Sequence, residues 1–482
     1  MASYALARKK GLLLLASITV VAAFACVYFL EEKPLPTLIF SDIGWEPEII
    51  SAGRPVVFKL KLAYRGFLPR LVTVRAFAAR YYDYLGFGKF KLFHEVRVSV
   101  FPGRESTVEI KWIPPEAGFY RLRFEVDEGS YLNQLIRVSG SKEVKKAFVF
   151  AVLGDNRPAS KDMPQPAVFK ELVREINLIH PDFVIIVGDV IYGGERDLAK
   201  LKGQWADFLA VYNRFEIPVF IAPGNHEMQT LSRPKSGNPD AQILYMMYFG
   251  RLFYAFAYGN SLFIVLDTDV VGSAAEISGK QLEWLKRILD LSKNYTHTFV
   301  FMHRPIVSYA GASLLNNYYK VLPLLLQYNV TAVFQGHNHA YYFREVNGTL
   351  FYVTGGAGAP LHRMPDEGGV HHFLLVEVNG SRVEVKFIPP YVLQVKNESN
   401  RVIIEYTFTE RIIFKDDGYT WFAEPKPLML RGICVETSTP CAAVEGGLVT
   451  AVVRGDHNYK VYVKTYIKPG EKKILTPRKA KP

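Results

Sequence analysis

The chain is poor in cysteine, with only three in 482 residues. Cys26 lies in an apolar segment, which leaves Cys434 and Cys441 as the pair that can form a disulfide in a folded domain. Outside the cytoplasm this pair would close a small loop, and two buried free thiols are the alternative. Internal repeats and a disorder-like composition are also lacking, since 49% of the residues are hydrophobic and 22% are charged. We therefore expect most of the chain to fold, as several domains.

Acidic residues are fewer than basic ones, and the formal net charge is +12. The excess lies at the two ends of the chain. Residues 8–10 supply +3, and residues 464–482 supply +6, which leaves +3 for everything between them. A domain that binds a polyanion concentrates Lys and Arg on its folded face. This distribution therefore argues against a nucleic-acid partner.

One apolar run is long: Gly11 to Leu30 is twenty residues without a charge. A run of this length can cross a bilayer as a helix. The basic residues 8–10 precede it, and such positive flanks stay in the cytoplasm. The sequence thus predicts a cytoplasmic stub and a single-pass membrane anchor over residues 1–33, with the folded domains that follow on the outside. A signal peptide cleaved near residues 23–25, followed by secretion, is the alternative.

Residues 34–143 alternate between apolar and polar positions, with no helical stretch between the turns. Phe58, Leu60 and Leu62, for example, alternate with lysines. Period-two alternation is typical of strands with one buried face. The segment is therefore predicted to be an all-β sandwich of the immunoglobulin or fibronectin type, with a spacer or packing role.

From residue 144 onward strands alternate with helical periods, which is typical of a layered α/β domain. The apolar runs 147–153 and 183–187 are two of its predicted strands. We assign residues 144–394 to this domain. Residues 395–482 contain further strand patterns and are predicted to form a small β-rich region with a basic tail.

Polar residues gather where the predicted α/β strands stop. Open α/β sheets bind ligands beyond their strand ends, so the clustering marks a candidate site. Taken singly, each residue has a simpler explanation as a turn, a helix cap or a structural histidine. Together they offer carboxylates, a phenol, an amide and imidazoles, which suit first-row metals better than calcium or magnesium. The candidates are Asp155, Asp189, Tyr192, Asn225, His226, His303, His337 and His339.

These residues belong to five short motifs that resemble, in order, those of calcineurin-like metallophosphoesterases. The Gly-Asp-x-x-Tyr spelling is similar to the purple acid phosphatase branch, whose larger members also carry a preceding β-sandwich. The resemblance covers about residues 147–392 and implies a layered αββα catalytic domain. The motifs are Gly154-Asp155, Gly188-Asp189-Val190-Ile191-Tyr192, Gly224-Asn225-His226-Glu227, Val300-Phe301-Met302-His303 and Gly336-His337-Asn338-His339.

The resemblance implies a site for two metal ions that share the carboxylate of Asp189. It implies that His226 stands outside the metal ligands and helps the leaving group depart. The first ion would take Asp155, Tyr192, His339 and Asp189. The second would take Asn225, His303, His337 and Asp189.

One position departs from the wider superfamily, whose first motif is Asp-x-His. Arg157 stands at the third position, and Tyr192 offers an anionic oxygen in place of the lost imidazole. A strongly charged metal can hold tyrosine deprotonated, although free tyrosine has a pKa of about 10. Charge balance then favours Fe(III) at the Tyr192 site and Fe(II), Zn(II) or Mn(II) at the second. The alternative is that Tyr192 is a loop aromatic over a divalent site.

Three further features near the motifs have open roles. Arg157 is expected either to point its guanidinium at substrate phosphate or to form a surface ion pair. The glycine-rich run 354–358 lacks the spacing and the following Lys of a nucleotide loop, so we expect a tight loop beside the metals. His362, His371 and His372 either shape the pocket or are packing and surface histidines.

The sequence thus predicts a dinuclear-metal phosphoesterase acting on a small phosphorylated substrate, a phosphate monoester or diester. Within the superfamily, a Zn- or Mn-dependent phosphodiesterase is the alternative enzyme. A cell-surface protein with a degenerate, non-catalytic phosphatase domain is the alternative from another class. Substrate identity and oligomeric state have no signal in the sequence.

Overall fold

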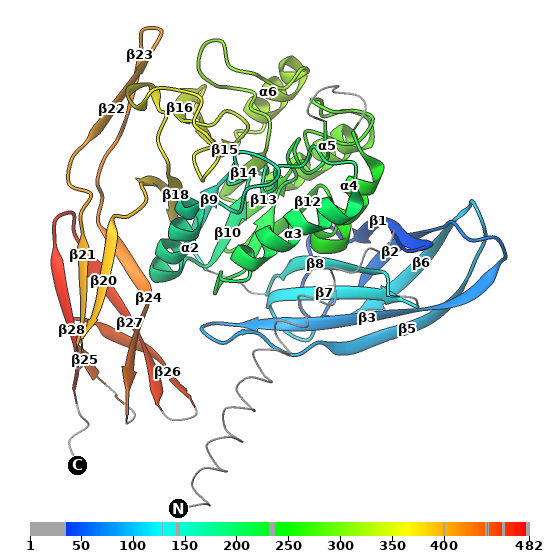
Figure 1. Cartoon of the computed structure of the whole chain (residues 1–482), viewed down its shortest axis with the longest axis horizontal. Helices are drawn as coiled ribbons and strands as arrows, with labels where there is room; N and C mark the ends of the chain where they lie inside the picture. Colours follow the sequence, from blue (N-terminus) through cyan, green and yellow to red (C-terminus); the bar gives the residue numbers. More distant parts are fainter. Residues whose placement is uncertain are drawn as a thin grey trace, which may run out of the picture.

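The computed structural model describes residues 35–127, 129–140, 145–230, 237–398, 401–438, 441, 443–455 and 458–478. The predicted membrane anchor, Gly11 to Leu30, lies outside the described residues. Over the part of the chain that is described, no helix has the length and apolar character needed to cross a membrane. Figure 1 shows three units in chain order: a β-sandwich, an α/β unit and a second β-rich unit.

The first unit consists of two antiparallel sheets, as its period-two pattern predicted. One sheet has the order β1-β2-β6, and the other has the order β4-β3-β7-β8 with β5 paired to β3. Phe58 of β2 and Phe124 of β7 pack between the sheets, with ring centroids 5.4 Å apart. The strands are β1 (Leu38–Glu46), β2 (Val56–Tyr64), β3 (Arg70–Tyr82), β4 (Gly86–Phe87), β5 (Lys91–Val100), β6 (Glu105–Trp112), β7 (Gly118–Val126) and β8 (Tyr131–Val138).

The α/β unit is built on two mixed sheets that lie face to face. Their orders are β11-β10-β9-β18-β19 and β12-β13-β14-β15-β17-β16. The strands of this unit are β9 (Ala147–Leu153), β10 (Phe183–Ile186), β11 (Val219–Ile221), β12 (Tyr254–Tyr258), β13 (Ser261–Val265), β14 (His297–Met302), β15 (Ala332–Gln335), β16 (Tyr341–Val346), β17 (Thr349–Thr354), β18 (Phe373–Asn379) and β19 (Arg382–Ile388).

Helices cover the outer faces of both sheets, which makes the predicted αββα order. Phe150 of β9 contacts Phe263 and Phe299 of the other sheet, with centroids 5.3 and 5.2 Å apart, so an aromatic core joins the sheets. The central strands are covered on both faces, which is why they are apolar runs rather than alternating ones. The helices are α2 (Ala167–Ile179), α3 (Leu198–Tyr212), α4 (Pro239–Phe249), α5 (Gly279–Ser292), α6 (Tyr318–Gln327) and the short η1 (Pro365–Glu367).

Helical periods in the sequence predicted helices in this unit, but α4 shows no such period. The reason is that α4 is buried on more than one side. It contacts the sandwich strand β8, and its Leu244, Tyr245 and Met246 are consecutive buried residues. A helix that is apolar all round shows no amphipathic period.

The sandwich is fixed to the α/β unit by a buried charge pair. The guanidinium of Arg251 donates to both carboxylate oxygens of Glu48 at 3.0 and 2.9 Å, and each side chain is 12% exposed. Trp284 of α5 also donates to Glu48, at 3.1 Å. Because burying an unpaired charge costs several kcal/mol, these contacts hold the two units in one arrangement.

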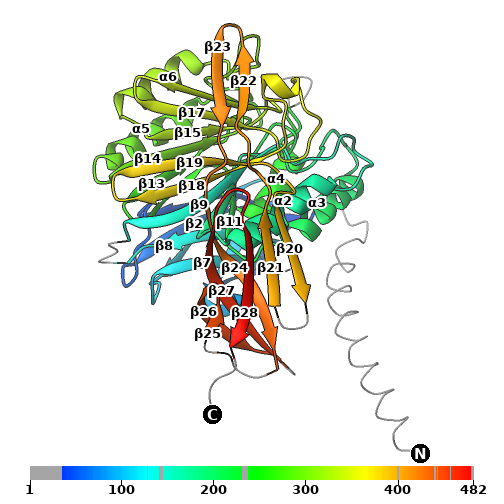
Figure 2. The same ribbon diagram turned by 90° about the vertical axis from the view of Figure 1, so that its left-hand side faces the viewer.

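The third unit begins with β20 and packs against α2. Its main sheets have the orders β20-β21-β28-β25 and β24-β27-β26, and β22 pairs with β23 as a hairpin. That hairpin extends back along the α/β unit (Figure 2). The strands are β20 (Leu393–Glu398), β21 (Arg401–Tyr406), β22 (Ile412–Asp416), β23 (Tyr419–Ala423), β24 (Leu428–Thr437), β25 (Ala443–Glu445), β26 (Leu448–Arg454), β27 (Tyr459–Ile467) and β28 (Lys472–Arg478).

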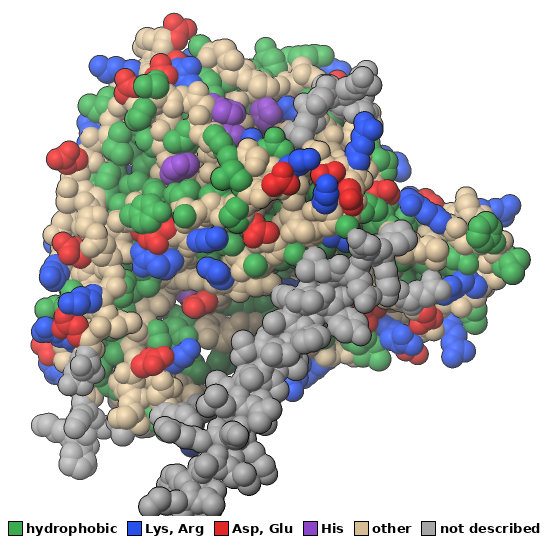
Figure 3. Space-filling view, in the orientation of Figure 1, with side chains coloured by type: hydrophobic (Ala, Val, Ile, Leu, Met, Phe, Trp, Pro, Cys, Tyr) green, Lys and Arg blue, Asp and Glu red, His purple; other side chains and the backbone are tan. Residues whose placement is uncertain are grey.

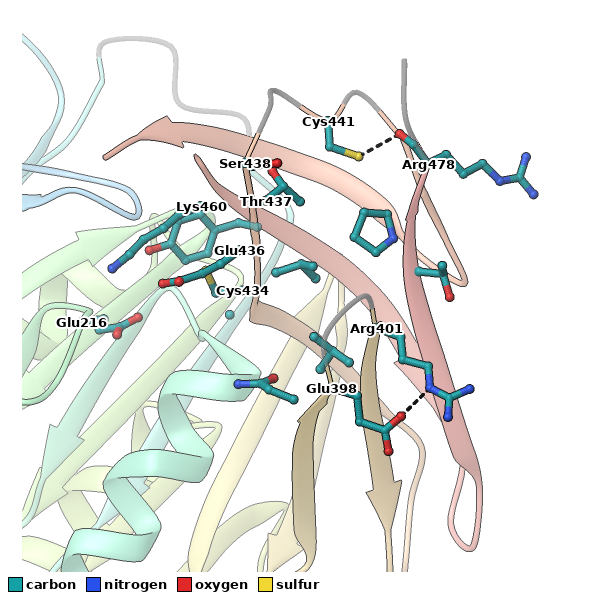
Figure 4. A pocket seen from close by; sticks show the side chains of 17 residues that line it. Glu216, Glu398, Arg401, Cys434, Glu436, Thr437, Ser438, Cys441, Lys460 and Arg478 are labelled. Atoms are coloured by element: carbon teal, nitrogen blue, oxygen red, sulfur yellow. Dashed lines mark hydrogen bonds and ion pairs between the residues drawn. The ribbon is translucent and has the colours of Figure 1, made fainter. Parts of the chain in front are cut away.

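Cys434 and Cys441 are both free thiols, so they do not form the disulfide that their spacing allows. They line a cavity of about 910 Å³ in the third unit. In Figure 4 their side chains lie on different segments of its wall, and the Cys441 thiol donates to the carbonyl oxygen of Arg478 at 3.2 Å.

Glu175 is a fully buried carboxyl at the junction of α2 with β20. Its Oε1 atom accepts from the backbone N–H of Leu393 at 2.8 Å, while Oε2 is buried without a hydrogen bond. Burial raises the pKa of Glu175 to about 7. The folded state therefore binds this proton more tightly than the unfolded state, whose carboxyl titrates near pH 4.5.

We expect the stability supplied by protonated Glu175 to be complete below about pH 4.5 and lost as the pH rises through 7. Glu175→Gln keeps the acceptor to Leu393 and removes the titration. Between pH 5 and pH 8 the wild type should lose roughly 3 kcal/mol relative to this variant. Calorimetric melting temperatures at both pH values, with exposed Glu283→Gln as control, measure the difference. Parallel pH profiles for wild type and Glu175→Gln would contradict it.

Candidate functional site

The candidate residues come together because five strands end at one edge of the two packed sheets. β9, β10 and β11 are parallel neighbours, as are β14 and β15. Each carboxyl end continues into a short loop that bears a predicted site residue, and parallel strands bring such loops side by side. In strand order these residues are Asp155, Asp189, Asn225, His303 and the pair His337 and His339.

Glycines allow these loops to approach one another closely. A Cβ on Gly336 would lie 2.6 Å from Oδ2 of Asp155, and one on Gly224 would overlap Oδ1 of Asp189. Two of the site residues that directly follow a glycine have a strained backbone conformation. Asp155 and Asp189 both have φ of 57°, a conformation that non-glycine residues adopt rarely and mostly where function requires it.

The ligand atoms of Asp155, Asp189 and His303 lie within 4.8 Å of one another. Nε2 of His303 is 3.2 Å from Oδ1 of Asp189 and 2.9 Å from Oδ1 of Asn225. On the Asp155 side, Nε2 of His339 is 3.3 Å from Oδ1 of Asp155. Nδ1 of His337 is also 2.9 Å from Oδ1 of Asn225. Six of the seven predicted metal ligands thus lie close together.

The hydrogen bonds of the histidines suit metal binding. Nδ1 of His303 lies 2.9 Å from the carbonyl oxygen of Val187, and Nδ1 of His339 lies 2.6 Å from that of Pro360. A carbonyl oxygen only accepts, so in the neutral rings Nδ1 carries the proton and the Nε2 lone pair faces the carboxylates. Oδ1 of Asp155 is buried and accepts no hydrogen bond. These nitrogen and oxygen atoms are therefore suited to bind a metal cation between them.

Positive charge at this position is strongly favoured. Burial alone would raise the pKa of Asp189, but His226 and His303 outweigh it and hold that pKa well below its usual range. Burial likewise opposes charge on His303, but the carboxylate of Asp189 outweighs it and raises the pKa of His303 to about 10. A proton on His303 and a metal ion are alternative ways to satisfy the same buried carboxylate.

His226, Arg157 and Tyr192 stand together on one side of this group. Nε2 of His226 is 3.6 Å from Oδ2 of Asp189, and Nε of Arg157 is 3.7 Å from the same oxygen. The ring of Tyr192 packs edge-on against His226 and under the guanidinium of Arg157. Among the described residues these two ring contacts link the Tyr192 side chain to the group.

Glu227 is a supporting residue to which sequence reasoning assigned no role. Its carboxylate accepts from the backbone N–H groups of Asp189, Val190, Ile191 and Gly224, at 2.7 to 3.2 Å. These four bonds lock the loop after β10 to the loop after β11. The only signal in the sequence was the position of Glu227 directly after Gly224-Asn225-His226. Its role as a hydrogen-bond acceptor could not be predicted, because that role depends on the contact between two loops.

A cavity of about 300 Å³ opens above these residues. Arg157, Asp189, Asn225, His226, His337 and His339 contribute to its wall, together with His362 and the loop 309–313. The histidines gather on this face of the molecule (Figure 3). His362 stacks on His339 with ring centroids 3.8 Å apart. His371 and His372 are not in the wall, and His372 is buried against Phe387.

The third unit reaches the cavity through its β22–β23 hairpin. Asp416 of β22 accepts from the backbone N–H of Ala310 at 3.1 Å and pairs with the side chain of Arg363. It thereby ties the loop 309–313 to the loop that carries His362. As expected, the glycine-rich run lies beside the site, since a Cβ on Gly355 would be 2.9 Å from Oδ2 of Asp155.

Residues 148–341 match the sequence profile of the family described as calcineurin-like phosphoesterases. The matched range contains all five motifs and six converging ligands. These residues form a calcineurin-like phosphoesterase domain.

Curated relatives of the phosphoesterase domain include two mammalian enzymes named tartrate-resistant acid phosphatase type 5. The human protein is 27% identical over 219 residues, which are 39% of this chain and 65% of that protein. The rat protein is 30% identical over 219 residues, 39% of this chain and 64% of that protein. The 3',5'-cyclic adenosine monophosphate phosphodiesterase CpdA of Haemophilus influenzae is 25% identical over 196 residues, 39% of this chain and 66% of that protein. The chain therefore spans less than two thirds of each relative.

Glu227→Gln should loosen the phosphoesterase site without removing a predicted ligand. Each carboxylate oxygen of Glu227 accepts from two N–H groups. In the glutamine variant, the NH₂ group replaces one of these oxygens and must face two N–H donors. We expect metal affinity to fall about 10- to 100-fold, as is typical when a group that orients metal ligands is changed. Calorimetric titration of the metal-depleted protein with Zn²⁺ or Mn²⁺ measures it, and exposed Glu283→Gln serves as control. Equal affinities for Glu227→Gln and wild type would rule out this positioning role.

Proposed function

We propose that the chain hydrolyses phosphate monoesters or diesters with two metal ions bound at the edge where β9, β10, β11, β14 and β15 end. The observation that carries the proposal is the position of Asp189. Its carboxylate lies within 4.8 Å of ligand atoms of both Asp155 and His303. A metal pair supplies activated water and positive charge for the phosphate oxygens.

The proposed ligand sets follow from the converging atoms and the family resemblance. Asp155, His339 and Asp189 would hold one ion, with Tyr192 as the additional ligand. Asn225, His303, His337 and Asp189 would hold the other. Six imidazole, amide and carboxylate side chains that converge on one another are retained, which argues against the degenerate, non-catalytic alternative.

His226 is proposed to deliver a proton to the departing oxygen of the substrate. Its Nδ1 atom is hydrogen-bonded to the carbonyl oxygen of Tyr192, which orients the ring. The opposite edge of the ring faces Asp189 and the cavity. With Nδ1–H donated to the carbonyl oxygen, the ring can release a proton from Nε2 when it is in the doubly protonated imidazolium form. Such proton transfer contributes about 10²- to 10⁴-fold to a rate.

Arg157 is proposed to bind the phosphate oxygens of the substrate. Its side chain is 12% exposed and lines the cavity, with Nε 3.7 Å from Oδ2 of Asp189, which supports the phosphate role over the surface ion pair considered for it. One terminal nitrogen donates to the carbonyl oxygen of Pro158 at 3.0 Å, while Nε is buried without a hydrogen bond. A fixed guanidinium with spare donors suits a phosphate group.

Asp189→Asn should lower turnover by ~10³-fold or more, because it removes the charge that both proposed ions share. Arg157→Ala should mainly raise KM, because it removes phosphate contacts. Steady-state assays of the metal-loaded protein on a panel of phosphomonoesters and phosphodiesters, from acidic to alkaline pH, test both variants. Asp290→Asn on the exposed side of α5 is the control. Wild-type rates for Asp189→Asn would break the mechanism, and the panel decides between monoesterase and diesterase.

We also propose Fe(III) at the Tyr192 side of the pair, with Fe(II), Zn(II) or Mn(II) at the other. A phenolate adds the negative charge that a trivalent ion balances, whereas the imidazole it replaces is neutral. The opposing proposal, two divalent ions, leaves Tyr192 as an aromatic wall for His226 and Arg157.

Wild-type protein loaded with iron should show a visible charge-transfer band from tyrosinate to iron, and Tyr192→Phe should lose it. Elemental analysis of both proteins measures the iron content in parallel. The neighbouring Tyr309→Phe, whose ring lines the same cavity, should keep the band. Iron-free wild-type protein without a band, active with Zn²⁺ or Mn²⁺, would exclude the iron proposal and leave the phosphoesterase proposal intact.

Residues 1–33 are proposed to anchor the protein in a membrane, with the phosphoesterase domain on the outside. The support is the uncharged run Gly11 to Leu30 and the basic residues before it. Secretion after signal-peptide cleavage is the competing proposal. Extraction of native membranes with alkaline carbonate separates them, because only an uncleaved anchor remains in the pellet.

A further inference from the structure

The N-terminal sandwich exposes apolar side chains at one end. Phe67 is 97% exposed, Leu68 is 75%, Leu71 is 60% and Phe101 is 44%. We call these four residues the apolar tip. Green hydrophobic side chains with blue basic ones beside them are visible at the far end of the sandwich in Figure 3.

The apolar tip is one surface, although its residues come from two loops and from the first residues of β3. The loop between β2 and β3 carries Phe67 and Leu68, and Phe101 follows β5. The backbone N–H of Gly103 donates to the carbonyl oxygen of Tyr64 at 3.0 Å, which joins the two loops. Strand β3 pairs with β5 so that Leu71 lies opposite Ser99. The four side chains therefore share one end of the sandwich.

Exposed basic residues flank the apolar tip. Arg65 precedes Phe67, and Arg104 follows Phe101. Arg65 pairs with Asp240 at 3.5 Å, and its side chain remains 54% exposed. Isolated exposed apolar residues are ordinary, but a clustered patch rimmed by polar residues marks an interaction surface. Apolar side chains with flanking arginines match the acyl boundary and the anionic headgroups of a lipid surface.

The path of the chain indicates which surface lies nearby. The backbone N–H of Arg65 donates to the carbonyl oxygen of Thr37 at 2.7 Å, so the chain enters the sandwich directly beside the tip. Thr37 is seven residues after Leu30, the end of the proposed anchor. Seven residues span at most about 25 Å. An anchored chain therefore keeps the apolar tip close to its own bilayer.

We propose that the apolar tip inserts into the interface of the bilayer that holds the anchor, with Arg65 and Arg104 on the headgroups. The inference rests on the proposed membrane anchoring. The tip then acts as a second attachment that stops the sandwich from swinging about a short tether. The catalytic cavity belongs to a different unit, so hydrolysis of soluble substrates does not depend on the tip.

The full-length protein reconstituted in lipid vesicles tests this proposal. Phe67→Trp places an indole at the tip, and the emission it adds is measured against the wild type with its five native tryptophans. Leu448→Trp is the matched control, because Leu448 is 67% exposed but lies in β26 of the third unit. In vesicles whose acyl chains carry bromine, added emission from position 67 should fall about twofold or more, and that from position 448 should not.

The outcomes separate the tip from the anchor. Quenching at position 67, strengthened by anionic lipid and absent at position 448, supports the proposal. Unquenched emission from Phe67→Trp in protein that resists carbonate extraction overturns the insertion of the tip and leaves the proposed anchor intact. A protein partner then covers the tip. Unquenched emission in protein that carbonate removes overturns both. Wild-type turnover of soluble substrate by Phe67→Trp verifies that the variant is folded.

Discussion

The structure depends on one buried carboxylate, that of Asp189, which is 1% exposed at the point where five strands end. A buried charge is costly unless positive or donor groups surround it. The imidazoles of His226 and His303 and the backbone N–H of His226 meet this need. Glu227 holds the backbone of the same loop through four N–H groups. The groups that surround this carboxylate, several of them proposed to bind metal, thus also stabilise the loops.

The rest of the molecule keeps these loops in place. The aromatic core around Phe150 sets the distance between the two sheets, and glycines allow the strand ends to approach. Glu48 and Arg251 fix the sandwich to the α/β unit. Asp416, from the third unit, braces the cavity loops from outside the phosphoesterase domain. Both flanking units therefore contact the phosphoesterase domain, and the third unit braces its cavity loops.

The cavity above the proposed metals is small and open, with a wall of arginine, histidine and loop backbone. Such a wall suits recognition of the phosphate group more than of a large leaving group. Similarity to proteins named as a phosphatase and as a cyclic-nucleotide phosphodiesterase is consistent with this: the matched region contains the phosphate chemistry. The cavity loop 309–313 is braced by Asp416, which belongs to a unit outside that region.

The sequence by itself determined the strands of the α/β unit, because buried parallel strands are continuous apolar runs. It also determined most ligand candidates, because each candidate follows such a run. Convergence of Asp155, Asn225 and His303 required the tertiary structure, since parallel pairing sets which strand ends meet. Helix α4 was hidden because burial on several sides removes its period. The roles of Glu227, His362 and Asp416, and the free state of Cys434 and Cys441, were likewise decided only in three dimensions, because contacts between distant segments leave no local pattern.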